Sequence, residues 1–245
     1  MRLQKVVDEM HFRTSNEAIE YLKKRDAKLG LAIDRIGPIE REVIPDLFAA
    51  LVNSIVGQQI SSKAHETVWR RLVERLGEVT PETVLSQSDE AIQSVGLSYR
   101  KVDYIKGAAQ RIVSGELDLE RLGRLSDEEL AQELVKLSGI GQWTAEMLMI
   151  FSLERQDVLS YGDLAILRGL RMLYRHRIIT PALFLKYKRR YSAYSSVASL
   201  YLWEISAGAL PELTDPAPLT EAEKKKRAKA RKVRQAEEAN AKDFR

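Results

Sequence analysis

Apolar residues recur every three or four positions through most of the chain, with polar residues between them. This spacing puts the apolar side chains on one face of a helix, and no stretch alternates in the way that a half-buried strand requires. Ser, Thr and Asp precede many of these segments and Gly follows several, as is usual at helix ends. The pattern therefore predicts an all-α protein of about ten helices.

The start and stop signals give approximate bounds for the helices. "Capping-box" spacings occur at Thr14 with Glu17 and at Ser126 with Glu129. Helices are expected from Thr14 to about Leu29, Asp46 to Gln58, Ser61 to Leu76, a short one from Thr80-Pro81, Ser88 to Val95, Tyr99 to Ser114, one from Ser126, one through Met147 and Ile150, Leu164 to about Tyr174, one from Thr180-Pro181, and Ser195 to Ala207. The segment 46–58 is apolar on most faces and is expected to be central.

The turn between two of these helices holds the most informative chemistry. Residues 137–145 read Leu-Ser-Gly-Ile-Gly-Gln-Trp-Thr-Ala, with apolar helices before and after. Glycines at 139 and 141 allow positive φ and leave the backbone uncovered, so that amides at the start of the second helix can approach an anion such as a DNA phosphate. By itself, the pattern is more typical of an ordinary αα-hairpin that ends in a glycine C-cap.

The amino-acid sequence of this turn resembles the helix-hairpin-helix element of the base-excision DNA glycosylases. In that superfamily a Gly/Pro-rich loop and a catalytic aspartate follow the hairpin. Here residues 157–166 read Asp-Val-Leu-Ser-Tyr-Gly-Asp-Leu-Ala-Ile, and Asp163 falls on the catalytic position. An Asp before an apolar helix is otherwise most simply an N-cap. The two motifs at this separation favour a glycosylase, over a resemblance that covers about residues 45–210.

The residue two positions after Gly141 distinguishes two chemistries within the superfamily. Members that also cut the strand carry a lysine there, whose amine forms a Schiff base, whereas this chain has Trp143. The resemblance therefore implies a monofunctional enzyme, with Asp163 stabilising an oxocarbenium-like transition state and orienting water. The absence of cysteine also argues against the branches that carry an iron–sulfur cluster.

Trp143 and Trp203 resemble the aromatic walls of the alkylation-repair branch, DNA-3-methyladenine glycosylase II. N-alkylated purines are cationic, and a cation over an indole face gains about 0.5 to 2 kcal/mol. Core packing is the alternative for both tryptophans. Met147 stands where other members place a second aromatic residue, and with Tyr161 it completes the expected base pocket.

The resemblance also implies an architecture and a DNA-contacting surface. It predicts two helical bundles flanking a DNA-binding cleft: residues 47–156, with the helix-hairpin-helix at 126–153, and a composite bundle of 1–46 plus 157–215. A wedge is expected between two helices, with Gln58 facing the gap left by the flipped base and Gln59 entering the duplex; a polar inter-helix turn is the alternative. The residues expected to contact DNA are Gln58, Gln59, Lys63, Gly139, Ile140, Gly141 and Thr144.

Charge is unevenly distributed along the sequence. The net charge is +4, but residues 221–245 alone carry +5, so the rest of the chain sums to −1. Within it, residues 164–203 hold eight Lys and Arg side chains and no acidic residue. Such a block inside folded helices indicates nucleic-acid binding better than a tail does, although a solvated helix face would look the same. Residues 216–245 are expected to be a basic tail, frayed or disordered, that either tethers DNA or only solubilises the chain.

The sequence also limits the remaining function classes. No apolar run reaches the ~20 residues of a membrane span and the N-terminus lacks a signal-peptide core, so we expect a monomeric, cytoplasmic protein, nucleoid-associated if bacterial. Neither a cofactor nor a metal is expected, except that such a hairpin can hold a monovalent cation through main-chain carbonyls, here those of Leu137 and Ile140. The expected activity is hydrolytic excision of N-alkylated purines such as 3-methyladenine and 7-methylguanine from damaged double-stranded DNA. The alternatives are a glycosylase for uracil, hypoxanthine or mismatched thymine, and a non-catalytic helix-hairpin-helix DNA-binding protein.

Overall fold

A computed structural model describes residues 11–218 of the chain, and most of the predicted basic tail lies outside these residues. The all-α prediction is confirmed: the described part contains thirteen helices, labelled α2 to α14, and no strand beyond a single bridge between His11 and Glu42. The helices are α2 (Asn16–Arg25), α3 (Ala27–Ile36), α4 (Leu47–Gly57), α5 (Ser62–Leu76), α6 (Pro81–Leu85), α7 (Asp89–Gln93), α8 (Tyr99–Val113), α9 (Leu119–Arg124), α10 (Asp127–Leu134), α11 (Gln142–Phe151), α12 (Leu164–Tyr174), α13 (Pro181–Tyr191) and α14 (Ser195–Ala207). Between residues 11 and 218, no helix has the length and apolar character that a membrane crossing needs.

Two of the helix starts show how far the predicted capping residues hold. Ser61 caps α5, and the capping box of Ser126 with Glu129 opens α10. The prediction for the first helix was wrong. Ser15, rather than Thr14, caps α2, and Asp26 adopts an extended conformation that ends α2 and caps α3. One predicted helix is therefore two, because the Asp26 side chain accepts a hydrogen bond from the amide of Leu29 and starts a new helix there.

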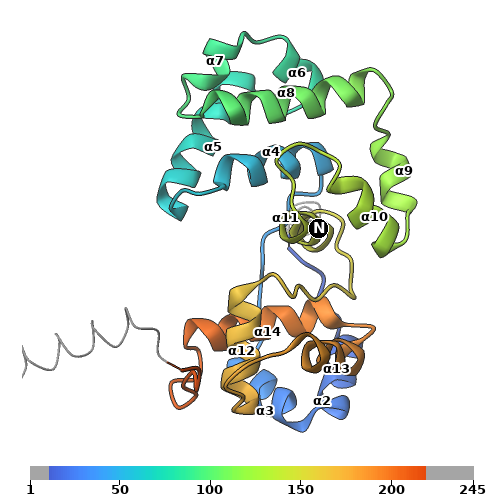
Figure 1. Cartoon of the computed structure of the whole chain (residues 1–245), viewed down its shortest axis with the longest axis vertical. Coiled ribbons are helices and arrows are strands. Elements are labelled where there is room, and N and C mark those ends of the chain that lie inside the picture. The colour runs from blue at the N-terminus through green and yellow to red at the C-terminus, as the bar shows by residue number, and fades with distance from the viewer. Residues whose placement is uncertain (1–10, 219–245) are drawn as a thin grey trace, which may run out of the picture.

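The helices form two groups, with α11 between them (Figure 1). In one group α4 packs on α5, α8 and α11, and the short α6 and α7 cover α8. In the other, α14 packs on α2, α3, α12 and α13. We propose the division predicted from the sequence, residues 47–156 against 1–46 plus 157–215, because these packing partners fall on either side of it.

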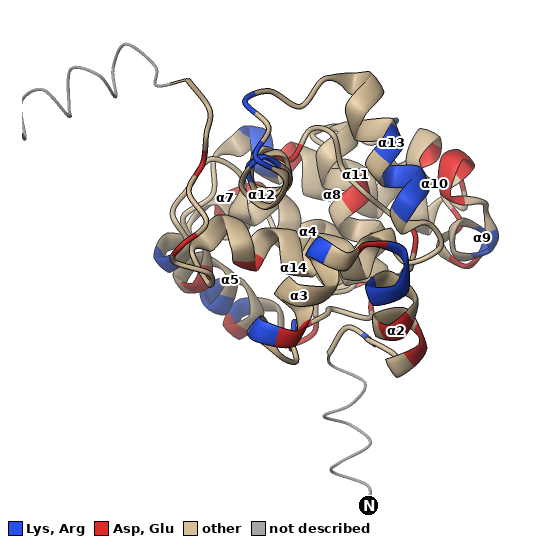
Figure 2. Ribbon diagram, turned by 90° about the horizontal axis from the view of Figure 1, so that it is seen from below, with Lys and Arg blue, Asp and Glu red and all other residues tan. Residues whose placement is uncertain are grey.

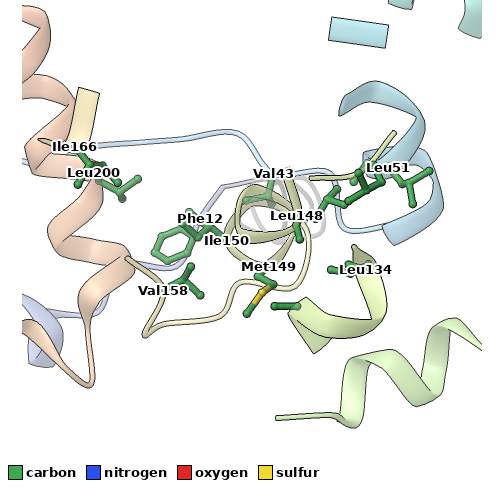
Figure 3. Close-up of a cluster of buried hydrophobic side chains, with 14 of the residues drawn as sticks. Phe12, Val43, Leu51, Leu134, Leu148, Met149, Ile150, Val158, Ile166 and Leu200 are labelled. Carbon is green, nitrogen blue, oxygen red and sulfur yellow. The ribbon is translucent and has the colours of Figure 1, made fainter. Parts of the chain in front are cut away.

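The apolar core continues from one group to the other through α11 (Figure 3). Leu148 of α11 faces Leu51 of α4. Ile150 lies near Phe12 and Val158, on the side of the group formed by α2, α3, α12, α13 and α14, which we call the composite group. All five side chains are buried. The amide of Ile44 donates a hydrogen bond of 2.9 Å to the carbonyl of Phe151, which attaches the segment between α3 and α4 to the end of α11. This packing fixes the two groups on either side of α11.

The acid-free block at residues 164–203 does not remain unpaired in space. Arg171 forms a two-pronged ion pair with Asp215, and Arg190 pairs with the buried carboxylate of Asp26. Asp26 and Asp215 both lie outside residues 164–203 in the sequence. The fold therefore brings acidic side chains to a segment that contains none of its own. Basic and acidic residues are interspersed in the view of Figure 2. The members of the block without an ion pair in residues 11–218 are Arg175, Arg177, Lys186, Lys188 and Arg189.

Candidate active site

Asp163 is held in one orientation by hydrogen bonds to both of its oxygens. As the N-cap of α12 it accepts the amides of Ala165 and Ile166 at Oδ1, at 2.8 and 3.0 Å. The indole Nε1–H of Trp143 donates to Oδ2 at 2.9 Å. The residue is only 7% exposed. Asp163 is therefore the N-cap of α12, and its catalytic role stays a prediction.

An open cavity of about 730 Å³ lies in front of this carboxylate. Trp143, Met147 and Phe151 lie one turn apart along α11 and form one wall, and Trp203 of α14 lines the cavity next to Phe151. The rings of Phe151 and Trp203 stack with centroids 5.6 Å apart. The cavity can therefore receive a flat ring next to a fixed carboxylate.

The structure brings together most of the predicted base pocket but not all of it. Trp143, Met147 and Trp203 line the cavity with Asp163, as the sequence predicts. Tyr161 does not line it. Its ring instead packs edge-on against Phe184, and its hydroxyl points to the carbonyl of Ile179 at 3.5 Å. Tyr161 precedes the turn that directs Asp163 inward, so its side chain leaves the loop toward α13.

Sequence reasoning missed the charged part of the cavity wall. Glu40, Arg41 and Glu42, from the segment between α3 and α4, all line the cavity. Arg41 is ion-paired with Glu204 of α14, whereas Glu40 and Glu42 have no ion pair among residues 11–218. Negative charge therefore exceeds positive charge around the cavity. No local motif marks this segment, which lies about a hundred residues before the hairpin in sequence.

The two hairpin glycines serve different purposes. Gly139 has a φ of 85°, and a Cβ on it would lie 2.3 Å from the ring of Tyr104, so this position needs glycine. Gly141 has a φ of −89°, which corrects the expectation of positive φ there. It is the N-cap of α11, has no side chain to cap the first amides, and would place a Cβ in open space. These amides remain open to an anion from outside the protein.

The predicted wedge is a tightly held tip between α4 and α5. Gln59 is exposed and has a φ of 59°, which is rare for a residue other than glycine. Two contacts on the preceding residue hold it there. Lys101 donates to the carbonyls of Val56 and Gln58. The side-chain Nε2 of Gln58 donates to the carbonyl of Gly139 at 2.8 Å. Burial lowers the pKa of Lys101, and the charge of Arg100 adds to this effect. The tip and the hairpin are thus joined.

The other predicted DNA-contacting residues divide by exposure. Lys63 is exposed in the first turn of α5. Ile140 and Thr144 are buried, so their backbone rather than their side chains is available at the hairpin. The carbonyl of Leu137 already accepts the amide of Ile140 at 3.0 Å, and the main-chain cation site stays a prediction. The described residues contain no cluster of His, Cys, Asp and Glu that could hold a metal ion.

Comparisons with known proteins agree with this geometry. Residues 52–189 match the family model of the HhH-GPD superfamily base excision DNA repair proteins. DNA-3-methyladenine glycosylase 1 of Schizosaccharomyces pombe is 36% identical over 174 residues, which cover 69% of this chain and 75% of that protein.

Two solved structures share the fold over most of their length. A crystal structure of a DNA-3-methyladenine glycosidase from Bacillus halodurans superposes with a TM-score of 0.74 at 35% identity, covering 82% of this chain and 94% of that one. The Schizosaccharomyces pombe 3-methyladenine DNA glycosylase in complex with abasic DNA gives a TM-score of 0.69 at 32% identity, covering 78% and 97%. The shared fold therefore extends over most of the chain rather than over the hairpin alone.

Proposed function

Because the chain belongs to the HhH-GPD superfamily of base excision DNA repair proteins, we propose that it is a monofunctional DNA glycosylase that excises N-alkylated purines by hydrolysis. The observation that carries the proposal is the fixed carboxylate of Asp163 at the edge of a cavity walled by Trp143 and Trp203. The names of the related proteins, which are 3-methyladenine glycosylases, support the same substrate class.

Asp163 is the proposed catalytic residue. As the glycosidic C–N bond breaks, the base leaves with the bonding electrons and positive charge develops on the deoxyribose. A carboxylate beside that carbon stabilises the charge, and it can orient the water whose oxygen forms the new bond to C1′ and whose proton is released. Trp143 has no amine with which to attack the sugar, so the product is an abasic site in an intact strand.

The electrostatics of the cavity support a cationic base. Alkylation at N3 or N7 places a formal positive charge on the purine, and the indole faces of Trp143 and Trp203 attract such a ring. The carboxylates of Glu40 and Glu42 add negative charge at the same cavity, where Arg41 is the only cationic residue of the described part of the chain and is already paired. A cationic base is also a better leaving group, so binding and reactivity favour the same lesions.

Double-stranded DNA is the proposed partner. The uncapped amides of α11 would hold a phosphate, and Gln59 would fill the space of the flipped base. Action as a monomer, and a cytoplasmic or nucleoid location, belong to the same proposal.

A lesion panel tests the proposed function. Purified protein should release 3-methyladenine and 7-methylguanine from methylated DNA, and at the same protein concentration it should act much more slowly on uracil or mismatched thymine. Faster release of a neutral lesion would move the substrate class to one of the alternatives. If no base is released from any duplex that the protein binds, the chain is a non-catalytic DNA-binding protein.

The hydrogen bond from Trp143 to Asp163 should contribute to the rate. Trp143→Phe keeps an aromatic wall but removes the Nε1–H donor, so we expect the single-turnover rate to fall about tenfold, a typical loss for a charge-assisted hydrogen bond. Trp203→Phe is the matched control, because the indole of Trp203 makes no hydrogen bond to Asp163. Equal losses in the two variants would show that only stacking matters.

Gly141 offers a test of the phosphate contact that leaves the fold intact. Gly141→Val adds a side chain in open space at a φ that valine can adopt, so melting should change little. The isopropyl group should obstruct a phosphate at the α11 amides and weaken binding to damaged and undamaged duplexes alike, by about three- to tenfold. Fluorescence anisotropy on both duplexes measures this. Unchanged affinity for both would mean that the hairpin does not contact the backbone.

A further inference from the structure

The tip between α4 and α5 lies next to the hairpin that precedes α11. The two elements flank a cavity of about 570 Å³, which is lined by Gln59 from the tip, Gly139 from the hairpin, and Trp143 and Met147 from α11. Trp143 and Met147 also line the base pocket. The cavity between the tip and the hairpin therefore adjoins the base pocket.

Helix α8 contacts both the tip and the hairpin. In its first turn, the ammonium of Lys101 donates to the carbonyl of Val56 at 2.9 Å and to that of Gln58 at 2.7 Å. One turn further along α8, Tyr104 lies so close to the hairpin that a Cβ on Gly139 would be 2.3 Å from its ring. The side chain of Gln58 adds a direct hydrogen bond of 2.8 Å to the carbonyl of Gly139. One helix therefore sets the position of the tip relative to the hairpin.

The contacts of Lys101 are with the backbone and not with an acid. No carboxylate among residues 11–218 forms an ion pair with its ammonium. A partly buried cation without a counter-charge is costly unless hydrogen bonds satisfy it, and here two carbonyls do so. The carbonyl of Val56 belongs to the last turn of α4, where a cation is generally favourable. The carbonyl of Gln58 lies beyond the end of that helix, so the second hydrogen bond holds the tip itself.

Gln59, at the tip, needs support from its neighbours. Its φ of 59° lies in the left-handed region, which a residue other than glycine keeps only where the surrounding structure holds it. The carbonyl of Gln58 and the amide of Gln59 belong to one peptide group, so rotating that group would change the φ of Gln59. By fixing this carbonyl, Lys101 stabilises the conformation in which the side chain of Gln59 is exposed.

We propose that Lys101 is a positioning residue for base flipping. Its two hydrogen bonds hold the tip rigid and in a fixed place beside the hairpin, so that Gln59 fills the stack while the lesion occupies the base pocket. The inference rests on the proposed glycosylase function and adds to it a residue that acts through Gln59. With a loose tip, phosphates would still bind at the amides of α11, but the extruded base would return to the duplex more often.

Lys101→Met tests the proposal, because methionine keeps the apolar stem of the side chain and removes its donors. We expect single-turnover excision of 7-methylguanine paired with cytosine to fall about tenfold at saturating protein. When the lesion lies opposite an abasic-site analogue, the rate should fall less than about twofold, because an unpaired base is easier to extrude. Affinity for undamaged duplex should stay within about twofold, because the phosphate contacts at the hairpin remain. An equal loss of rate on both substrates would overturn the proposal.

Two further variants separate positioning from the stability of α8. Lys106→Met is the matched control, since Lys106 lies on the same helix but donates to the carbonyl of Gln87 at 2.6 Å and pairs with Asp89 of α7. It should leave excision of the paired lesion unchanged, and a loss as large as that of Lys101→Met would overturn the proposal. Lys101→Arg keeps the charge and the donors, so it should retain at least about a third of the wild-type rate. No recovery relative to Lys101→Met would overturn the role of the hydrogen bonds.

Fluorescence of 2-aminopurine next to the lesion reports flipping directly. In stopped-flow mixing with the paired duplex, Lys101→Met should give a smaller rise than the wild-type protein at the same bound fraction, which anisotropy measures. A normal rise would overturn the proposal and leave the proposed function standing. Failure of the wild-type protein to release 7-methylguanine from either duplex would overturn the proposed function, on which this inference rests.

Discussion

Asp163→Asn is expected to lower the single-turnover excision rate about 10²-fold or more. The neutral amide keeps the size of the side chain but removes the charge that faces the developing oxocarbenium ion, and loss of one preorganised electrostatic group typically has an effect of this size. The amide oxygen can still accept the amides of Ala165 and Ile166, because Asn is as good an N-cap as Asp. It cannot also accept from Trp143. Rapid-quench excision of a 7-methylguanine duplex at saturating protein measures the rate.

The control for this variant is the same substitution at a cap far from the cavity. Asp118 caps α9 through the amide of Arg121, so Asp118→Asn removes a charge from a helix N-terminus without touching the site. It should leave excision and DNA affinity unchanged. Near-normal excision by Asp163→Asn would remove this residue from the catalytic role, whatever its place in the motif.

Local signals in the sequence predicted most helices because a helix end depends on few residues. The caps at Ser61 and Ser126 each satisfy an amide three residues ahead, so a window of four residues identifies them. The error at Asp26 has the same origin. Asp favours a helix start over a helix interior. The carboxylate of Asp26 also pairs with Arg190, 164 residues away, and no local window of sequence contains that contact. The short helix α9 was missed because six residues show no periodicity.

The residues of the candidate site could be predicted where they belong to a sequence motif. The hairpin and Asp163 lie twenty residues or so apart in one continuous segment, and Trp203 could be matched by its helix. Glu40 and Glu42 could not, because they reach the cavity only when two helical groups pack on either side of α11. The prediction that Tyr161 lines the base pocket was wrong for a different reason. A residue two positions from Asp163 in the sequence can point in another direction, because the turn between them sets the direction of each side chain.

Gly169→Ala is expected to be the most destabilising single-methyl change in the composite group. A Cβ on Gly169 of α12 would lie 2.3 Å from the carbonyl oxygen of Leu202 in α14. Backbone atoms cannot rotate away, so the two helices must separate by roughly 1 Å, and overpacking of this kind costs about 1 to 3 kcal/mol. In a chain of this size each kcal/mol shifts the melting temperature by about 2 to 4 °C. Differential scanning calorimetry measures the loss.

Gly107→Ala is the matched control for stability. Gly107 lies in the middle of α8 on an exposed face, and a Cβ there meets no atom within 4 Å. The same substitution should therefore stabilise the protein by about 0.5 to 1 kcal/mol, through the better helix propensity of alanine. If Gly169→Ala lowers the stability and Gly107→Ala raises it, the contact between Gly169 and α14 is the cause of the loss.

The contact between Gly169 and Leu202 should also affect excision. Asp163 caps α12 and Trp203 follows Leu202 in α14, so separating these helices moves the carboxylate away from one wall of the base pocket. A displacement of about 1 Å between reacting groups can lower a rate by up to about 10²-fold. We therefore expect Gly169→Ala to slow single-turnover excision of 7-methylguanine at 20 °C, where the variant is still folded by circular dichroism. Wild-type excision by a folded but destabilised variant would show that the site tolerates this shift, and that Asp163 is positioned by Trp143 rather than by the packing of α12 on α14.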